Sequence, residues 1–251
     1  MSQSTSPLIP LNDRPHATSA LILFPYAGGS AHCYRSLVDT LGAHVAAWSA
    51  CLPGRERRIA EKPFTDIADA AQEMAGAAAE ICRSTPTVLF GHSMGGLLAY
   101  ETVLLLQNDR VPVAGLALSA TPAPHGGLLP DVTARVMNEA LTGRRVLHEL
   151  TPWETTGQSQ AKYVLAPVMA DAAMVLRYSR STPAPVSCPM WLATGSVDAL
   201  APLSSLANWQ EVAQHKIGPR TFPGDHAYLD TAAQEVGTDL STMLLPPLPA
   251  A

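Results

Sequence analysis

The sequence predicts a doubly wound α/β domain with a mostly parallel sheet, and three observations support that prediction. Short apolar or β-branched runs alternate regularly with longer segments of helical spacing through the first half of the chain. One strand-to-helix junction, Gly91-His-Ser-Met-Gly95, matches the pattern G-x-S-x-G. The alternation stops near Thr121 and resumes near Met190, which indicates an insertion into the sheet.

Composition sets the expected domain organisation. A chain of 251 residues, 47% of them hydrophobic, can form one large domain or two small ones. We expect one domain over residues 19–244, preceded by a polar, proline-punctuated flexible arm at 1–18 and followed by a disordered tail at 245–251.

Charge and cysteine content exclude several functions. The net charge of −5, with no long run of one sign, argues against a nucleic-acid partner, which calls for a basic face. The four cysteines show no C-x-x-C spacing, so we expect neither a metal site nor a redox motif, and no cofactor.

The N-terminal residues and the apolar segments indicate where the protein is located. The first residues lack a basic segment followed by an apolar core, and no apolar run reaches transmembrane length. We therefore expect a cytoplasmic protein with reduced thiols and no membrane association.

The elements follow from hydrophobic patterning. The expected strands are 20–24, 45–50, 87–90, 115–119, 190–194 and 215–222. The expected helices of the domain body are 30–41, a segment capped by Thr65 or Asp66 and ending near 82, 94–107 and 227–244.

The insertion at residues 125–180 contains no convincing strand. Residues 131–140 and 167–178 have helical spacing, and an insert of this size is commonly a lid or a substrate pocket. Met137, Met169 and Met174 suit an adaptable apolar wall, although they also suit simple packing of the insert onto the body.

The G-x-S-x-G junction predicts a nucleophile at Ser93. A strand that turns at once into a helix holds its serine in a cramped backbone conformation, and Gly91 and Gly95 lack side chains that would collide there. Gly96 lets helix and strand approach closely. A chance glycine-serine turn is the alternative, and the flanking strand and helix favour the nucleophile.

The segment Pro25-Tyr-Ala-Gly-Gly-Ser30 follows the first expected central strand. Its two glycines permit a tight turn with inward N–H groups, so the N–H near Tyr26 or Ala27, together with that of Met94, predicts an oxyanion hole. An ordinary strand-to-helix turn is the alternative.

A serine nucleophile requires a base, usually a histidine steered by a carboxylate. In folds of this kind the chain order is serine, acid, histidine. Only His226 follows the final expected strand, and Asp198 follows the penultimate one. His92 adjoins the serine and points elsewhere by geometry, and Asp225, adjacent to His226, is interpreted as a turn residue.

Four motifs carry a family resemblance that spans about residues 20–244. They are Phe24-Pro-Tyr-Ala-Gly-Gly-Ser30, Leu52-Pro-Gly-Arg-Glu-Arg-Arg58, Gly91-His-Ser-Met-Gly-Gly96 and Gly224-Asp-His226. Together they resemble the type II thioesterases of polyketide and non-ribosomal peptide pathways. The resemblance implies an α/β-hydrolase fold with a helical lid.

The resemblance also implies an activity: hydrolysis of acyl or aminoacyl groups from the phosphopantetheine arm of an acyl- or peptidyl-carrier protein, for editing or release. We accordingly expect a stand-alone serine thioesterase, active as a monomer, with Ser93, His226 and Asp198 as its triad. The alternatives are a small-molecule carboxylesterase or lipase, and a non-catalytic carrier-binding protein.

Two features bear on the substrate. Asp225 and Ala227 flank His226 where the family commonly has a glycine and a bulky aromatic residue, which predicts an altered pocket wall. Arg55, Arg57 and Arg58 are candidates for holding a phosphate or docking an acidic carrier, and a solvated loop is an equally good interpretation.

Overall fold

The computed structural model describes residues 6–126, 131, 134, 158–178, 180, 182, 184–214 and 218–244. Within them the chain forms a seven-stranded sheet in the order β1-β3-β2-β4-β5-β6-β7. The strands are β1 (Leu8–Pro10), β2 (Ser19–Phe24), β3 (Val45–Ala50), β4 (Thr87–His92), β5 (Gly115–Ser119), β6 (Met190–Gly195) and β7 (Arg220–Phe222). All neighbours pair in parallel except β1 with β3, which confirms the predicted sheet type.

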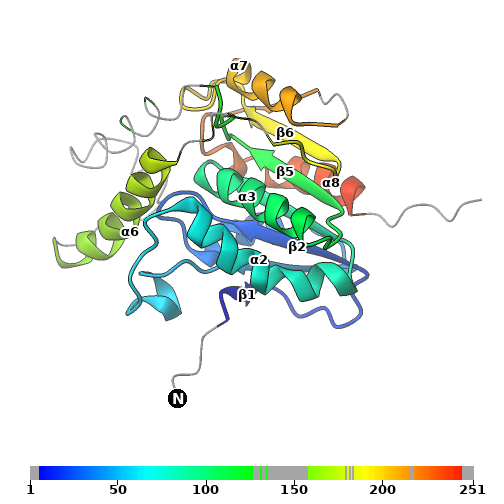
Figure 1. The fold of residues 1–251 in the computed structure, drawn as a ribbon, viewed down its shortest axis with the longest axis horizontal. Coiled ribbons are helices and arrows are strands. Elements are labelled where there is room, and N and C mark those ends of the chain that lie inside the picture. Colours follow the sequence, from blue (N-terminus) through cyan, green and yellow to red (C-terminus); the bar gives the residue numbers. More distant parts are fainter. Residues whose placement is uncertain are drawn as a thin grey trace, which may run out of the picture.

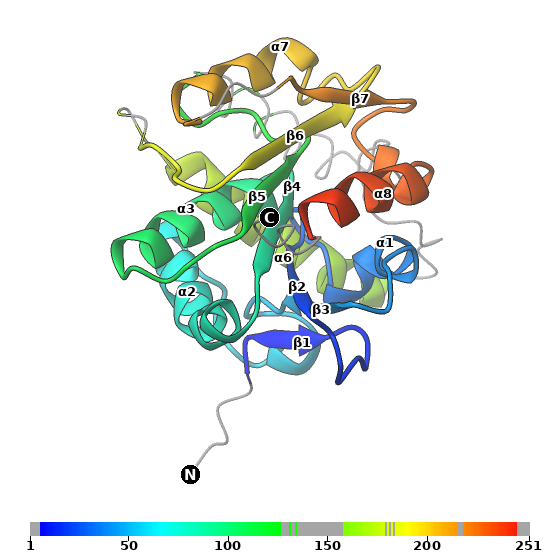
Figure 2. The same cartoon turned by 90° about the vertical axis from the view of Figure 1, so that its right-hand side faces the viewer.

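Helices cover both faces of the sheet. Figure 2 shows α2 (Ile67–Ser84) and α3 (Met94–Asn108) on one side and α1 (Arg35–Asp39) and α8 (Ala233–Met243) on the other. Every residue of β2, β4 and β5 is consequently buried, as expected of central parallel strands. Of the two predicted caps for α2, the structure selects Asp66, whose carboxylate accepts a 2.6 Å hydrogen bond from the Ala68 N–H.

The predicted flexible arm at 1–18 is wrong for Leu8–Pro10. These residues pair with β3, and Leu8 faces the core with 4% of its surface exposed. A three-residue strand is too short to show a period, and its proline sits at the end of an edge strand, where a missing N–H is tolerated.

Several other boundaries differ from expectation. The helix expected at 30–41 is split into η1 (Ala31–Tyr34) and α1, and the last helix starts only after η4 (Tyr228–Asp230). Three short elements were not predicted: η2 (Glu56–Arg58), α7 (Leu203–Leu206) and η3 (Ala207–Glu211). Each spans five residues or fewer, so tertiary contacts rather than periodicity set its conformation.

The insertion between β5 and β6 contains α6 (Gln158–Arg177), which extends the helix predicted at 167–178. Figure 1 shows α6 at the end of the sheet toward which β5 points. The helix predicted at 131–140 lies outside the described residues except for Asp131 and Ala134, as does the tail at 245–251.

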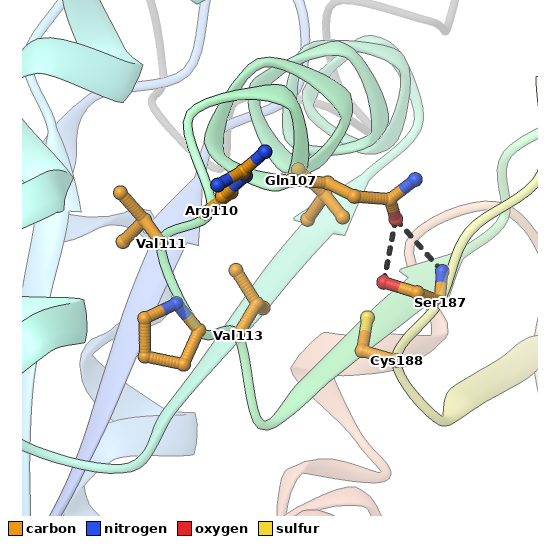
Figure 3. A pocket seen from close by; sticks show the side chains of 8 residues that line it. Gln107, Arg110, Val111, Val113, Ser187 and Cys188 are labelled. Atoms are coloured by element: carbon orange, nitrogen blue, oxygen red, sulfur yellow. Dashed lines mark hydrogen bonds between the residues drawn. The ribbon is translucent and has the colours of Figure 1, made fainter.

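A hollow of about 310 Å³ opens at the opposite end of the sheet, where β5 and β6 begin (Figure 3). It lies between the end of α3 and the segments that precede those strands, and Gln107 spans it by accepting hydrogen bonds from the N–H and hydroxyl of Ser187 at 2.8 and 2.7 Å. It is therefore separate from Ser93, which follows the carboxyl end of β4.

In the part of the chain that the structure describes, no helix is both long and apolar enough to span a bilayer.

Candidate active site

Ser93 lies at the junction of β4 and α3 in a left-handed backbone conformation, with φ 55° and ψ −122°. Its N–H donates to the Ser119 carbonyl at 2.8 Å, and its carbonyl accepts from the Thr121 hydroxyl at 3.0 Å. A positive φ is rare for a residue with a side chain and persists only where the surroundings enforce it. The cramped conformation predicted for Ser93 is confirmed.

Three glycines make this turn possible. A Cβ at Gly91 would lie 2.2 Å from the carbonyl oxygen of Gly95, and one at Gly95 would lie 1.9 Å from that of Phe24. A Cβ at Gly96 would lie 2.0 Å from the Thr121 hydroxyl. Both motif glycines face backbone, which cannot move aside as a side chain can, so the turn needs glycine there.

Asp198 and His226 reach one another from the loops after β6 and β7. The Nδ1 of His226 is 2.8 Å from Asp198 Oδ2, and the two residues are only 5% and 4% exposed. Asp198 Oδ1 accepts 2.8 Å hydrogen bonds from the N–H groups of Leu200 and Ala201. The loop backbone thus aims the carboxylate at the imidazole.

The charge of Asp198 is stabilised in place. Burial alone would raise the pKa of this carboxyl, but the hydrogen bond and charge of His226 and the two backbone N–H donors outweigh burial and lower the pKa below its usual value. An ionised Asp198 is suited to orienting the imidazole and stabilising its cation.

Asp225 has the turn role expected of it. Its Oδ1 accepts a 2.9 Å hydrogen bond from the Ala227 N–H, two residues along the chain. Gly224, with φ +125°, starts the same turn. Asp198, and not Asp225, is therefore the carboxylate that bonds the imidazole.

His92 is a neutral neighbour of the site. Its Nδ1 lies 2.7 Å from the Ser119 hydroxyl, which in turn lies 2.6 Å from the Tyr228 hydroxyl. Burial, followed by the nearby charge of His226, lowers the pKa of His92 to about 3. The rings of His92 and His226 have centroids 5.0 Å apart, which places His226 beside the residue that precedes Ser93. Direct pairing of His226 with the Ser93 hydroxyl stays a prediction.

The loop at residues 25–30 lies next to this group. The Gly29 N–H donates to the Tyr26 carbonyl at 2.8 Å, and the Gly28 N–H donates to the Asp171 carboxylate at 2.7 Å. Since both glycine N–H groups are engaged, the oxyanion prediction rests on Ala27 and on Met94, whose N–H belongs to the first turn of α3. That role of Ala27, Met94 and the Tyr26 position stays a prediction.

The interpretation of Arg55 and Arg58 as docking or phosphate-binding residues, or as a solvated loop, is wrong. Arg55 pairs with Asp171 and Arg58 with Glu61 and Glu73, and the two arginine side chains are 6% and 5% exposed. Arg57 alone of the three is exposed, and it donates to the Leu8 carbonyl at 2.8 Å.

Asp171 was not predicted from the sequence. It lies on α6 three residues after Val168 and four before Val175, and all three are buried. An acidic residue within the buried stripe of a helix was the available signal, since a buried charge requires a partner.

Comparison with known proteins identifies the family. The thioesterase domain family matches residues 19–242, which is most of the chain. The chain belongs to the thioesterase family. This hydrolase is 30% identical over 241 residues to the thioesterase PikA5 of Streptomyces venezuelae, covering 92% of this chain and 83% of that one.

Solved structures agree with the family. The type II thioesterase BorB from the borrelidin biosynthetic cluster superposes with a TM-score of 0.84 at 25% identity, covering 98% of this chain and all of that one. YbtT, a type II thioesterase from the yersiniabactin pathway, gives 0.80 at 28% identity and covers 95% and 98% of the two chains. The α/β-hydrolase fold expected from the resemblance is confirmed.

Proposed function

We propose that this thioesterase is a type II enzyme that hydrolyses acyl or aminoacyl thioesters on the phosphopantetheine arm of a carrier protein. The observation that carries the proposal is the buried Asp198–His226 hydrogen bond next to the strained turn at Ser93. The relatives named above, from polyketide and non-ribosomal peptide pathways, support the substrate class.

In the acylation step, Ser93 Oγ attacks the thioester carbonyl while His226 accepts the serine proton. Asp198 stabilises the resulting imidazolium through its 2.8 Å hydrogen bond. The N–H groups of Ala27 and Met94 receive the oxyanion. When the tetrahedral intermediate collapses, the C–S bond breaks and the pantetheine thiolate leaves, protonated by His226.

In the deacylation step, His226 removes a proton from water, which attacks the acyl-serine carbonyl. Collapse of the second intermediate breaks the C–O bond to Ser93, and His226 returns its proton to that oxygen. The acid is released and the enzyme is restored. The neutral His92 beside His226 adds no competing positive charge to the imidazolium formed in either step.

The lid is part of the proposal. The cover over Ser93 is the role predicted for the insertion at residues 125–180; α6 (Gln158–Arg177) is the helix of it that the structure describes, and residues 127–130 and 135–157 lie outside the described residues. Hydrogen exchange tests this idea: amides of α6 should exchange faster than those of β4, and equal protection would contradict a mobile cover.

We also propose a monomer that works in the cytoplasm. The four cysteines at 33, 51, 82 and 188 are free, and burial raises the pKa of all four thiols, Cys51 and Cys82 to about 11, Cys188 to about 12 and Cys33 well above its ordinary value. Free thiols are typical of proteins from a reducing compartment, where disulfides are rare. Size-exclusion chromatography with light scattering checks the monomer.

The decisive experiment offers one acyl group on a carrier protein, on a short pantetheine-like thiol and on a simple alcohol. We expect kcat/KM to be highest for the carrier, because binding energy far from the carbonyl can orient the reacting group. Faster turnover of the alcohol ester would establish a carboxylesterase instead. Carrier binding without turnover of any of the three would establish a non-catalytic binding protein.

A further inference from the structure

The loop at residues 25–30 is held by side chains that come from far along the chain. The Gly28 N–H donates to Asp171 Oδ2 at 2.7 Å, and the Gly29 carbonyl accepts from Arg55 Nη1 at 3.0 Å. Just after the loop, the Ala31 N–H donates to Glu56 Oε1 at 3.2 Å. Three closely spaced anchors therefore fix the backbone on the carboxyl side of Ala27.

Two of these anchors are joined to each other. Arg55 Nη2 lies 2.6 Å from Asp171 Oδ1, and the two side chains are 6% and 5% exposed. Asp171 thus uses one oxygen for the loop and the other for Arg55, while Arg55 uses one nitrogen for Asp171 and another for the loop. The pair closes a ring of hydrogen bonds around Gly28 and Gly29.

Stability alone is a poor explanation for this pair. Desolvation of two buried charges offsets most of their attraction, and apolar residues of similar size often stabilise a fold as well. The segment that carries Arg55 is itself strained, because the next residue, Glu56, has φ +47° without being glycine. Strain and buried charge together point to a requirement for geometry at this loop.

The helix that supplies Asp171 lies directly on the loop. A Cβ at Gly28 would lie 2.2 Å from Val168 Cγ2, one turn before Asp171 on α6. Gly28 also has φ +78°, in the region that favours glycine. The path of the loop and the position of α6 are therefore mutually dependent.

We propose that Arg55 and Asp171 are positioning residues that hold the 25–30 loop so that the Ala27 N–H faces the oxyanion, and that α6 must be seated for this arrangement to form. The inference rests on the proposed function, since it assigns the loop to the oxyanion hole. It makes seating of α6 a condition for transition-state stabilisation as well as for covering the substrate.

The second buried arginine of the same segment provides a matched control. Arg58 is as buried as Arg55 and is also ion-paired, but its partners are Glu61, Glu73 and the Cys51 carbonyl, away from the 25–30 loop. Lysine keeps the charge in both cases and loses the planar fork that serves two partners at once. Arg55→Lys and Arg58→Lys therefore remove the same chemistry from two different places.

The test measures the rate at which a fluorophosphonate labels Ser93, with Ser93→Ala as the control for labelling at that residue. The serine oxygen bonds to phosphorus, His226 takes the serine proton and fluoride leaves, through a transition state whose phosphoryl oxygen uses the oxyanion donors. Loss of one oxyanion donor lowers the rate by about 10²–10³. Partial misplacement of the Ala27 N–H in Arg55→Lys or Asp171→Ala should therefore lower the labelling rate by about 10- to 100-fold. Arg58→Lys and Glu73→Ala should label at the wild-type rate.

A second readout separates positioning from general damage. In thioester hydrolysis, Arg55→Lys and Asp171→Ala should lower kcat with KM little changed, and should weaken binding of a boronic acid that forms a tetrahedral adduct on Ser93. If Asp171→Ala does not fold, Arg55→Lys and Asp171→Asn take its place. Thermal unfolding of all variants shows which losses of activity accompany a loss of stability.

Wild-type labelling rates in Arg55→Lys and Asp171→Ala would overturn the inference, and so would equal losses in Arg58→Lys. The labelling reaction requires no carrier protein or acyl group. A protein that labels readily yet hydrolyses no thioester would therefore refute the proposed function and leave the positioning role testable. A wild-type Ser93 that never reacts would refute both.

Discussion

The turn at Ser93 and the loop at 25–30 lie side by side and are held in different ways. Ser93 is fixed by glycines within three residues of it in the sequence and by hydrogen bonds of its own backbone to the Ser119 carbonyl and the Thr121 hydroxyl at the end of β5. The 25–30 loop is fixed by the side chains of Arg55, Glu56 and Asp171, the last of them on α6.

This difference separates two parts of the chemistry. The nucleophile is positioned by its own turn and by the adjoining end of β5, and should tolerate changes in the insertion and in the segment that carries Arg55. The predicted oxyanion donor at Ala27 depends on distant segments and on a helix of the insertion. We therefore expect variants of the two regions to differ in how activity and stability are lost.

The largest effect is expected for Ser93→Ala. Removal of a triad serine costs on the order of 10⁶ in kcat. Because the turn is held by backbone groups, the thermal unfolding midpoint should stay close to that of the wild type. Steady-state kinetics measures the loss of kcat, and calorimetry measures the unfolding midpoint. Substantial hydrolysis by a folded Ser93→Ala protein would exclude the covalent mechanism.

A smaller loss is expected at the carboxylate. Asp198→Asn should lower kcat by about 10⁴, because the amide holds the imidazole in the wrong tautomer. Asp225→Asn is the matched control, since its side chain bonds only the turn at Ala227 and an amide oxygen can still accept that hydrogen bond. The reverse ranking of the two variants would show that Asp225 is the functional acid.

A pair of glycine variants compares the two regions directly. In Gly95→Ala the new Cβ meets the Phe24 carbonyl 1.9 Å away, and since the backbone cannot yield, the free energy of unfolding should fall by about 3 kcal/mol. In Gly28→Ala the obstacle is the side chain of Val168, so α6 can shift at a cost of about 1–2 kcal/mol for the left-handed backbone.

Gly28→Ala should consequently lose more activity than its stability loss explains. Denaturant unfolding and kcat measured on the same preparations check this expectation. A Gly28→Ala variant that is as unstable as Gly95→Ala, or fully active, would remove the contrast between the two regions.

The smallest expected effect is the change of the free energy of unfolding with pH. The folded pKa of Asp198 is below its unfolded value of about 3.9, so the unfolded state binds more protons between the two values. The stabilisation is complete above about pH 4 and is lost as pH falls through the folded pKa. Urea unfolding from pH 6 to 2 gives the free energies of unfolding of the wild type and of Asp198→Asn, and the difference between them should become smaller at the acid end. A difference that stays constant with pH would contradict this expectation.

The sequence located the parts of the site that local rules or chain order define. Ser93 follows from G-x-S-x-G between a strand and a helix, because the backbone conformation there is set within five residues. Asp198 and His226 follow from topology, since the carboxyl ends of parallel strands meet at one edge of the sheet. Their hydrogen bond is what those rules anticipate.

Only the tertiary structure decided the roles of the arginines and of Asp171. Arg55 and Asp171 are 116 residues apart, and no local pattern says which of two similar arginines meets the insertion and which meets α2. The same reason explains β1, whose three residues form a strand because β3 offers a free edge. Side-chain chemistry and backbone period can be read from the chain, but a buried pair forms only where packing brings two distant segments together and removes water from between them.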